Sequence, residues 1–238
     1  MSAFLYGIRL QFKLDIRSKT LLITCYVVPL LFFAIMGGIF TSLMPEDKYT
    51  LIQSMTVMGI SMGALIGLPP SLVEIYGSDM KKMYKANGVP LFQGLTSIIL
   101  STFIHLLIMS IIILAVAPIV FDAKLPSNLL LYFSSVAIFI AVSLSIGSIL
   151  GLLVKNQAKL TMFSQLVFLP SIMLSGIMFS VDLLPKVLKS IGMVFPAAWG
   201  YKLLVNDGHY LGNLIPLFAI LLISIVFCSF LLKKIQSE

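Results

Sequence analysis

The stretch EIYGSDMKKMYKANGVP, residues 74–90, is the longest polar interruption in a chain that is otherwise mostly apolar. Its charged side chains are Glu74, Asp79, Lys81, Lys82 and Lys85. Apolar side chains recur between them at helical spacing, namely Ile75, Met80, Met83 and Tyr84. A connection between two membrane helices needs only a few residues. The extra length and the periodicity therefore predict a short helix over 78–88 that lies on the membrane surface and offers an apolar edge to a partner.

The composition places this polar stretch inside a membrane protein. Of the 238 residues, 59% are hydrophobic and 11% are charged, and the mean hydropathy is +1.08, whereas about 25% of a soluble domain is charged. The sequence therefore predicts an all-α integral membrane protein. We interpret the net charge of +7 as a mark of the cytoplasmic side and expect no nucleic-acid partner. Cys25 and Cys228 lie in apolar runs and indicate neither a disulfide nor a metal site.

Six apolar segments are long enough to cross a bilayer, for which about 20 residues suffice. They cover approximately 20–43, 50–72, 92–118, 128–153, 161–180 and 211–232. We expect them to form a single transmembrane domain over 20–238. The first segment is expected to remain as a permanent span, because no small-residue cleavage site follows Leu21–Phe40.

The first 19 residues are too charged to cross the membrane. On a helix, Phe4, Ile8, Phe12 and Ile16 form one stripe. A neighbouring stripe carries Arg9, Lys13 and Arg17. This pattern predicts an amphipathic helix over 1–19 that lies in the headgroup layer with its basic side towards anionic lipid.

The distribution of basic residues predicts the orientation of the chain. Eleven of the 16 Lys and Arg residues fall in the N-terminal segment, the 73–90 loop, the 154–160 turn and the C-terminus. The other five are Lys48, Lys124, Lys186, Lys189 and Lys202. Since basic residues accumulate in cytoplasmic loops, both termini and the stretch at 74–90 are expected in the cytoplasm.

Small residues recur at every fourth position in two spans. Gly59, Gly63 and Gly67 share one face of the second, and Gly147 and Gly151 share one face of the fourth together with Ser143. Such faces allow helix backbones to approach closely. They are expected to serve packing within one six-helix bundle or a seam between subunits.

The chain beyond the fifth span is divided by prolines. Pro170, Pro185 and Pro196 separate pieces that are each too short to cross the membrane. Between them, 181–194 alternates apolar and polar residues. We expect a re-entrant hairpin of short helices over 170–196 that dips into the outer leaflet, where protein or a water-filled cavity must cover the irregular backbone.

The sequence contains no motif for catalysis. A GxxxxGK[ST] loop, an HExxH pair and a GxSxG turn are all absent. His105 is the one titratable side chain expected deep in the membrane, where ionisable groups are often functional. Its span has no acidic residue, so both structural packing and a role in substrate or proton handling remain open. The lack of a carboxylate at the centre of any span argues against an ion-coupled carrier.

In these features the chain resembles the membrane subunit of bacterial type-2 ABC exporters, of the group that exports drugs and antimicrobial peptides. That family has a coupling helix between its second and third spans. Glu74 and Gly77 are similar to its start, Met80-Lys81-Lys82-Met83 to its core and Gly88-Val89-Pro90 to its exit. The family's outer LSG-x-x-F motif and the prolines after it are similar to Leu174-Ser175-Gly176, Phe179, Leu184-Pro185 and Phe195-Pro196.

The resemblance implies a mechanism in which this chain has no cofactor of its own. A separate ATPase subunit, present in two copies and holding ATP and magnesium, would dock on the coupling helix from the cytoplasm. Met80, Met83 and Tyr84 would be buried in that contact, and Lys81, Lys82 and Lys85 would meet acidic rims. The turn at Lys155 and Asn156 would be a weaker second contact. Two permease chains, as a homodimer or with a sister permease, would alternate between inward-closed and outward-open states.

The same resemblance implies an outer gate and a location. The gate would be formed by the hairpin residues Pro170, Ser175, Gly176, Phe179, Pro185 and Pro196. The protein would lie in the bacterial cell membrane, in contact with lipid. The spans suit an amphipathic or hydrophobic cargo, with a peptide or drug favoured over a lipid-linked glycan. The alternatives are the substrate-binding subunit of an energy-coupling-factor importer and an intramembrane enzyme, the latter disfavoured by the missing catalytic pairs.

Overall fold

The computed structural model describes residues 3–43, 48–78, 80–178, 180–206 and 208–237. For residues 3 and 85 it describes the backbone only. Within these ranges the regular structure is entirely helical. The first half comprises α1 (Ala3–Arg17), α2 (Lys19–Leu22), η1 (Ile23–Val27), α3 (Val28–Leu43), α4 (Leu51–Met62), η3 (Gly63–Gly67), α5 (Leu68–Tyr76), α6 (Met80–Ala86) and α7 (Leu91–Phe121). The second half comprises α8 (Leu129–Leu153), α9 (Gln157–Met173), η4 (Val181–Leu183), α10 (Lys186–Gly192), α11 (Pro196–Val205) and α12 (Tyr210–Ser237).

Five helical segments among the described residues are long and apolar enough to cross a membrane. They are Lys19–Leu43, Leu51–Tyr76, Leu91–Phe121, Leu129–Leu153 and Tyr210–Ser237. They correspond to the first, second, third, fourth and sixth predicted spans. The fifth predicted span contains α9, which has 17 residues with Pro170 inside it and ends at Met173 rather than near residue 180. The chain is thus an all-helical, multi-pass membrane protein.

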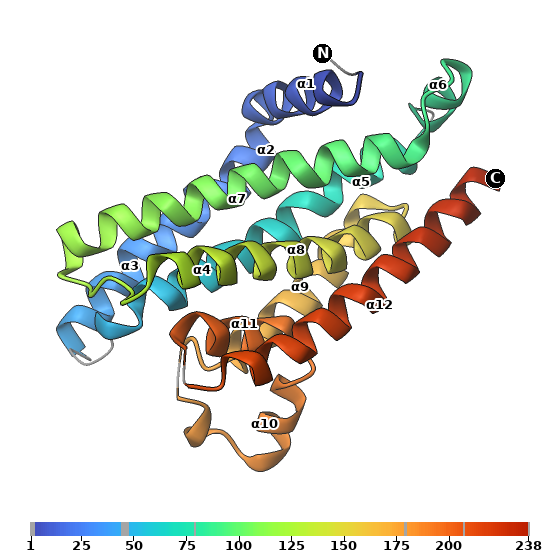
Figure 1. The fold of residues 1–238 in the computed structure, drawn as a ribbon. Coiled ribbons are helices and arrows are strands. Elements are labelled where there is room, and N and C mark those ends of the chain that lie inside the picture. The colour runs from blue at the N-terminus through green and yellow to red at the C-terminus, as the bar shows by residue number, and fades with distance from the viewer. Residues whose placement is uncertain (1–2, 44–47, 79, 179, 207, 238) are drawn as a thin grey trace.

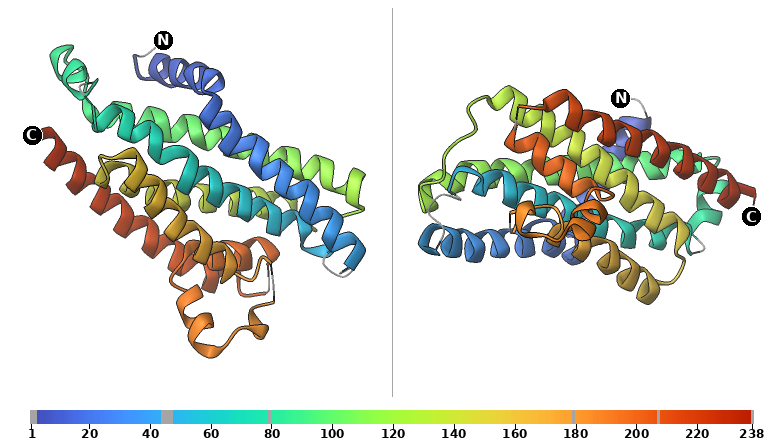
Figure 2. Two further views of the ribbon diagram at one scale, coloured as in Figure 1. Left: turned by 180° about the vertical axis from the view of Figure 1, so that it is seen from behind. Right: turned by 90° about the horizontal axis from the view of Figure 1, so that it is seen from below.

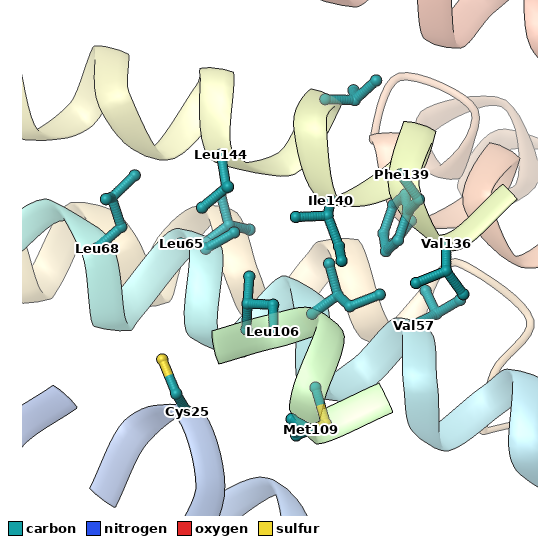
Figure 3. Close-up of a cluster of buried hydrophobic side chains, with 14 of the residues drawn as sticks. Cys25, Val57, Leu65, Leu68, Leu106, Met109, Val136, Phe139, Ile140 and Leu144 are labelled. Carbon is teal, nitrogen blue, oxygen red and sulfur yellow. The ribbon is translucent and has the colours of Figure 1, made fainter. Parts of the chain in front are cut away.

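The second span forms the centre of the bundle. Of the most apolar window in Leu51–Tyr76, 89% of the residues are buried, whereas the corresponding windows at Lys19–Leu43 and Tyr210–Ser237 reach only 22% and 17%. Val57, Leu65 and Leu68 of this span meet Ile140 and Leu144 of α8 in the core (Figure 3). A hydrogen bond of 2.8 Å between Thr56 Oγ1 and Tyr132 Oη ties the same two helices together. Lipid can therefore contact mainly the outer helices.

The five predicted packing glycines lie where helices of this chain approach each other. A Cβ atom on Gly147 would come within 2.0 Å of the Ala64 carbonyl oxygen. On Gly151 it would lie 3.0 Å from that of Pro69. The other three face different helices: Gly59 faces Met109 and Pro29, Gly63 faces Leu106 and Cys25, and Gly67 faces Thr24 and Cys25. Close approach between α8 and the second span thus needs the absence of a side chain at 147.

The first two spans also each contain a π-helical turn, and the turns face each other. These are η1 and η3, and the Sγ atom of Cys25 in η1 lies against Gly63 and Gly67 at either end of η3. A π-helical turn widens the helix locally and is frequent at functional sites. Here it brings the backbones of the two spans together at glycine residues.

The connections sort to two ends of the bundle (Figure 1). The helix α6, the α8–α9 turn and the end of α12 gather at one end, and the end of α3, the start of α4 and the α7–α8 connection lie at the other. At the latter end, Lys124 Nζ donates to Tyr49 Oη at 3.1 Å, and Lys48 lies 3.9 Å from Asp122. The segment around α10 projects from the side of the bundle, as the view from behind also shows (Figure 2).

Candidate functional site

The sequence around α6 defines both ends of this short helix. At its start, the Ser78 hydroxyl accepts a hydrogen bond from the Met80 N–H at 3.2 Å. At its end, Gly88 has φ of +66°, and the Val89 N–H donates to the Tyr84 carbonyl at 2.9 Å. This is a Schellman cap, in which a left-handed glycine ends the helix and the next residue closes it. The helix covers Met80–Ala86, slightly less than the predicted 78–88.

Two tyrosines attach α6 to the spans on either side. Tyr76, the last residue of α5, donates a hydrogen bond of 2.6 Å from its hydroxyl to the Leu91 carbonyl at the start of α7. The Tyr84 ring of α6 lies against Gly94 of α7, where a Cβ atom would be 3.1 Å from Cε1 of Tyr84 and 3.2 Å from the Tyr76 hydroxyl. Both rings thus meet over Gly94. A displacement of α6 would act directly on the second and third spans.

The outer face of α6 is apolar at its centre and basic beside it. Met80 is 40% exposed and Met83 is 64% exposed. They line a groove of about 360 Å³ with Tyr84, Asn87 and Val89. Lys82 is exposed and Lys81 half-buried next to this groove. Flexible, polarisable methionines suit a surface that another protein covers.

The other residues predicted for this site are placed around α6. Glu74 is exposed in the last turn of α5, and its backbone carbonyl accepts a hydrogen bond from the Ser78 hydroxyl. The side chain of Lys85 lies outside the described structure. The α8–α9 turn lies close by, since a Cβ atom on Gly77 would be 3.3 Å from the Lys155 carbonyl oxygen. In that turn the Asn156 side chain caps α9 by accepting from the Lys159 N–H at 3.1 Å.

The predicted outer gate falls on several separate elements. Pro170 lies inside α9, Pro185 immediately precedes α10, and Pro196 is the first residue of α11. Between them, the Ser175 hydroxyl donates to the Ile172 carbonyl at 2.7 Å and Gly176 has φ of +88°. Phe179 lies outside the described residues. A cavity of about 480 Å³ is lined by residues 176–178 and 180–183 together with Phe40, Ser54 and Tyr201.

A buried polar cluster joins α1 to the third span, and Asp15 is the member that the sequence did not identify. Asp15 is only 3% exposed; Gln11 Nε2 donates to its Oδ1 at 2.8 Å, and the Ser101 hydroxyl donates to its Oδ2. Next to it, His105 Nδ1 and the Tyr26 hydroxyl share a hydrogen bond of 2.8 Å. The Phe12 ring stacks on His105 with 4.5 Å between ring centroids. His105 Nε2 is buried and has no hydrogen-bond partner among the residues that the structure describes.

The face of α1 that packs on the rest of the protein differs from the predicted apolar stripe. The half-buried residues Ile8, Gln11 and Phe12, with Asp15, turn towards α7, whereas Phe4 and Ile16 of the predicted apolar stripe are exposed. Asp15 is the only acidic residue in the first 19, and it follows Ile8 and Phe12 on one helical face. An isolated acidic residue on an otherwise apolar helix face is the sequence signal from which this buried cluster could have been predicted. His105 thus has a carboxylate neighbour, supplied by α1 rather than by its own span.

Comparisons with known proteins agree with this architecture. The family model described as ABC-2 type transporter matches residues 3–206. A probable multidrug ABC transporter permease, YbhS, of Escherichia coli (strain K12) is 30% identical to this chain over 102 residues, which cover 42% of this chain and 26% of that protein. The YbhS protein of Escherichia coli O157:H7 gives the same values. The aligned part is thus about a quarter of the length of these relatives.

Proposed function

The chain belongs to the ABC-2 type transporter family, and we propose that it is the membrane subunit of an ATP-driven exporter. In this proposal a separate subunit hydrolyses ATP, and the chain moves an amphipathic or hydrophobic cargo, such as a peptide or drug, out of the cell. The ATP and magnesium belong to the partner. Family membership argues against the alternatives of an energy-coupling-factor importer subunit and an intramembrane enzyme.

The observation that carries the proposal is the construction of α6. Its ends are capped by Ser78 and Gly88, and the Tyr84 ring rests on Gly94 of the third span. At the same time Met80 and Met83 face outwards beside lysines. A rigid helix with an exposed apolar face is a suitable lever, because force on Met80 and Met83 reaches two spans through Tyr76 and Tyr84. The lysines add charge that favours an acidic partner surface and speeds association.

We propose the cytoplasm as the location of this end of the bundle, with the protein in a bacterial cell membrane. Figure 1 shows α6, the α8–α9 turn and the C-terminus together, and these segments carry much of the basic charge. The positive-inside rule favours the cytoplasmic side for them. The exposed basic side chains of α1, namely Arg9, Lys13 and Arg17, would then meet anionic lipid of the inner leaflet.

We propose a sixth crossing between α8 and α12, and the ends at which these two helices finish support it. Both end where α6 lies, so in this proposal the chain between them runs back across the membrane (Figure 1). The helix α9 starts that return, and its 17 residues span roughly 26 Å at 1.5 Å per residue. This is slightly less than the ~30 Å core of a bilayer. The irregular segment after Met173 would complete the crossing as a re-entrant hairpin and act as the outer gate.

The cavity beside this hairpin supports a gate at the outer end. Gly176 and Leu183 of the hairpin line it together with Phe40, Ser54 and Tyr201. Movement of the hairpin would change the size of an opening that already combines apolar and hydroxyl groups. Such a lining suits an amphipathic cargo. In the proposed assembly two permease chains, identical or sister, work with two ATPase subunits.

Loss of the two methionines tests this function. Met80→Ala with Met83→Ala should remove at least ~2 kcal/mol of the contact with the ATPase, since buried apolar anchors dominate such interfaces. The ATPase that co-purifies with the wild-type chain should be lost from the variant, together with cargo transport. Met162→Ala with Leu166→Ala, at exposed apolar residues of α9 outside the hairpin, is the matched control. Normal co-purification and transport in the first variant would contradict the proposal.

A further inference from the structure

The groove over α6 continues towards the C-terminus of the chain. A second groove of about 450 Å³ lies where the chain leaves α6 and enters α7. It is lined by Gly88, Val89, Pro90 and Leu91, and by Gln236 of α12. Val89 lines both grooves, so they adjoin. The end of α12 therefore borders the surface assigned above to the ATPase.

The last turns of α12 are held against the protein. Leu231, Leu232 and Ile235 are buried, while Lys233 and Lys234 between them are exposed. The helix thus packs one face on the bundle and presents its basic face at the end where α6 lies. Figure 1 and Figure 2 show the C-terminus and α6 at this same end.

The size of α6 requires a neighbouring surface to contribute to docking. The helix has seven residues and is roughly 10 Å long at 1.5 Å per residue. A standard interface buries ~800 Å² on each partner and involves ~20 or more residues. A helix of this length cannot supply that area. Adjoining exposed surface of suitable chemistry must therefore take part in a stable complex.

We propose that the C-terminal end of α12, with Lys233, Lys234 and Gln236, forms a second part of the docking surface for the same ATPase subunit that binds α6. The two adjoining grooves contain the apolar residues Met83 and Val89, and exposed basic residues lie on both elements that border them, Lys82 on α6 and Lys233 and Lys234 on α12. This matches an interface with an apolar centre and a polar rim. The partner surface should carry acidic groups on both sides of an apolar ridge. The inference rests on the proposed function.

Site-specific photocrosslinking in cells tests the inference on the intact complex. A photoreactive phenylalanine analogue is placed singly at Met83, at Gln236 and, as a control, at Val187, which is exposed on α10. We expect Met83 and Gln236 to capture the same ATP-binding subunit, identified by mass spectrometry, and Val187 not to capture it. Capture at Met83 with none at Gln236, or with lipid alone at Gln236, would overturn this inference and leave the proposed function intact. If the analogue at Met83 captures no ATP-binding subunit, the proposed function itself is contradicted.

Removal of charge gives a second, independent measurement. Lys233→Gln with Lys234→Gln should reduce the affinity for the purified ATPase about threefold to tenfold, and the loss should shrink at high salt. The matched control is Lys186→Gln with Lys189→Gln on α10, which should leave the affinity unchanged. If wild type and the α12 variant are present in the membrane in equal amounts and bind the ATPase with equal affinity, a contact at α12 is contradicted.

Discussion

The hydroxyl of Ser101 on α7 donates a hydrogen bond to the Oδ2 atom of Asp15 on α1, although 86 positions separate the two residues. A carboxyl group buried in this way must be compensated by hydrogen bonds. Gln11 supplies a second donor at 2.8 Å. The N-terminal helix is therefore attached to the third span at a defined register and does not simply float on the membrane surface.

Replacement of Asp15 by Asn should stabilise the protein increasingly as the pH rises. Burial raises the pKa of Asp15 above its ordinary 3.8, and this outweighs the lowering by Ser101, Gln11 and His105. The folded state thus holds the proton more tightly than the unfolded chain. The stability that this group contributes is full below its unfolded pKa and is lost as the pH rises through its folded pKa.

Thermal unfolding in detergent measures this effect. The difference in Tm between Asp15→Asn and wild type should grow as the pH rises above the ordinary pKa of a carboxyl group, about 4. The titratable groups around Asp15 are Tyr26 and His105, which face the cluster, and Cys25, which lies near it. The substitution leaves all three unchanged. Asp122→Asn, at an exposed carboxyl, is the control. A difference that is flat or falls with pH would refute the buried position of Asp15.

Gly147→Ala should destabilise the bundle. The added Cβ would meet the Ala64 carbonyl at 2.0 Å, and backbone cannot move aside as a flexible side chain can. Overpacking of this kind costs typically ~1–3 kcal/mol. Gly38→Ala is the matched control, because a Cβ there has nothing within 4 Å. It should be neutral or slightly stabilising, as expected for Ala in a helix. Equal Tm values for the two variants would contradict the packing of α8 on the second span.

Tyr84→Ala should separate docking from coupling. The substitution leaves Met80 and Met83 in place but removes the ring that rests on Gly94. ATPase binding should fall only a few-fold, whereas cargo-stimulated ATP hydrolysis should be lost. Tyr84→Phe keeps the ring and should restore both. Normal cargo stimulation in Tyr84→Ala would show that force does not pass through this ring.

Cysteine labelling checks the predicted orientation. A cysteine at Lys82 should be protected from a membrane-impermeant maleimide in intact cells and should react after the membrane is opened. A cysteine at Lys124, at the opposite end of the bundle, should react from outside. Cys25 and Cys228 are buried and give little background. Reaction of the Lys82 cysteine in intact cells would show that α6 lies outside the cell and would contradict the predicted orientation.

The sequence alone was sufficient for the class of protein and for most of its helices. Runs of apolar residues must be helical in lipid, and this physical constraint needs no knowledge of tertiary contacts. Five of the predicted spans therefore correspond to long apolar helices. The short helix between the second and third spans was also predictable, because Ser78 and Gly88 are local signals for its ends.

Tertiary structure alone decided which residues meet across the chain. Asp15 and Ser101 come together because α1 folds back over α7, and no local pattern encodes that contact. Gln236 reaches the exit of α6 for the same reason, through the packing of α12 on α8. Periodicity shows that a helix has an apolar face but not whether lipid or another helix covers it. In a membrane both environments are apolar, so hydrophobicity cannot distinguish them and close packing determines the partners.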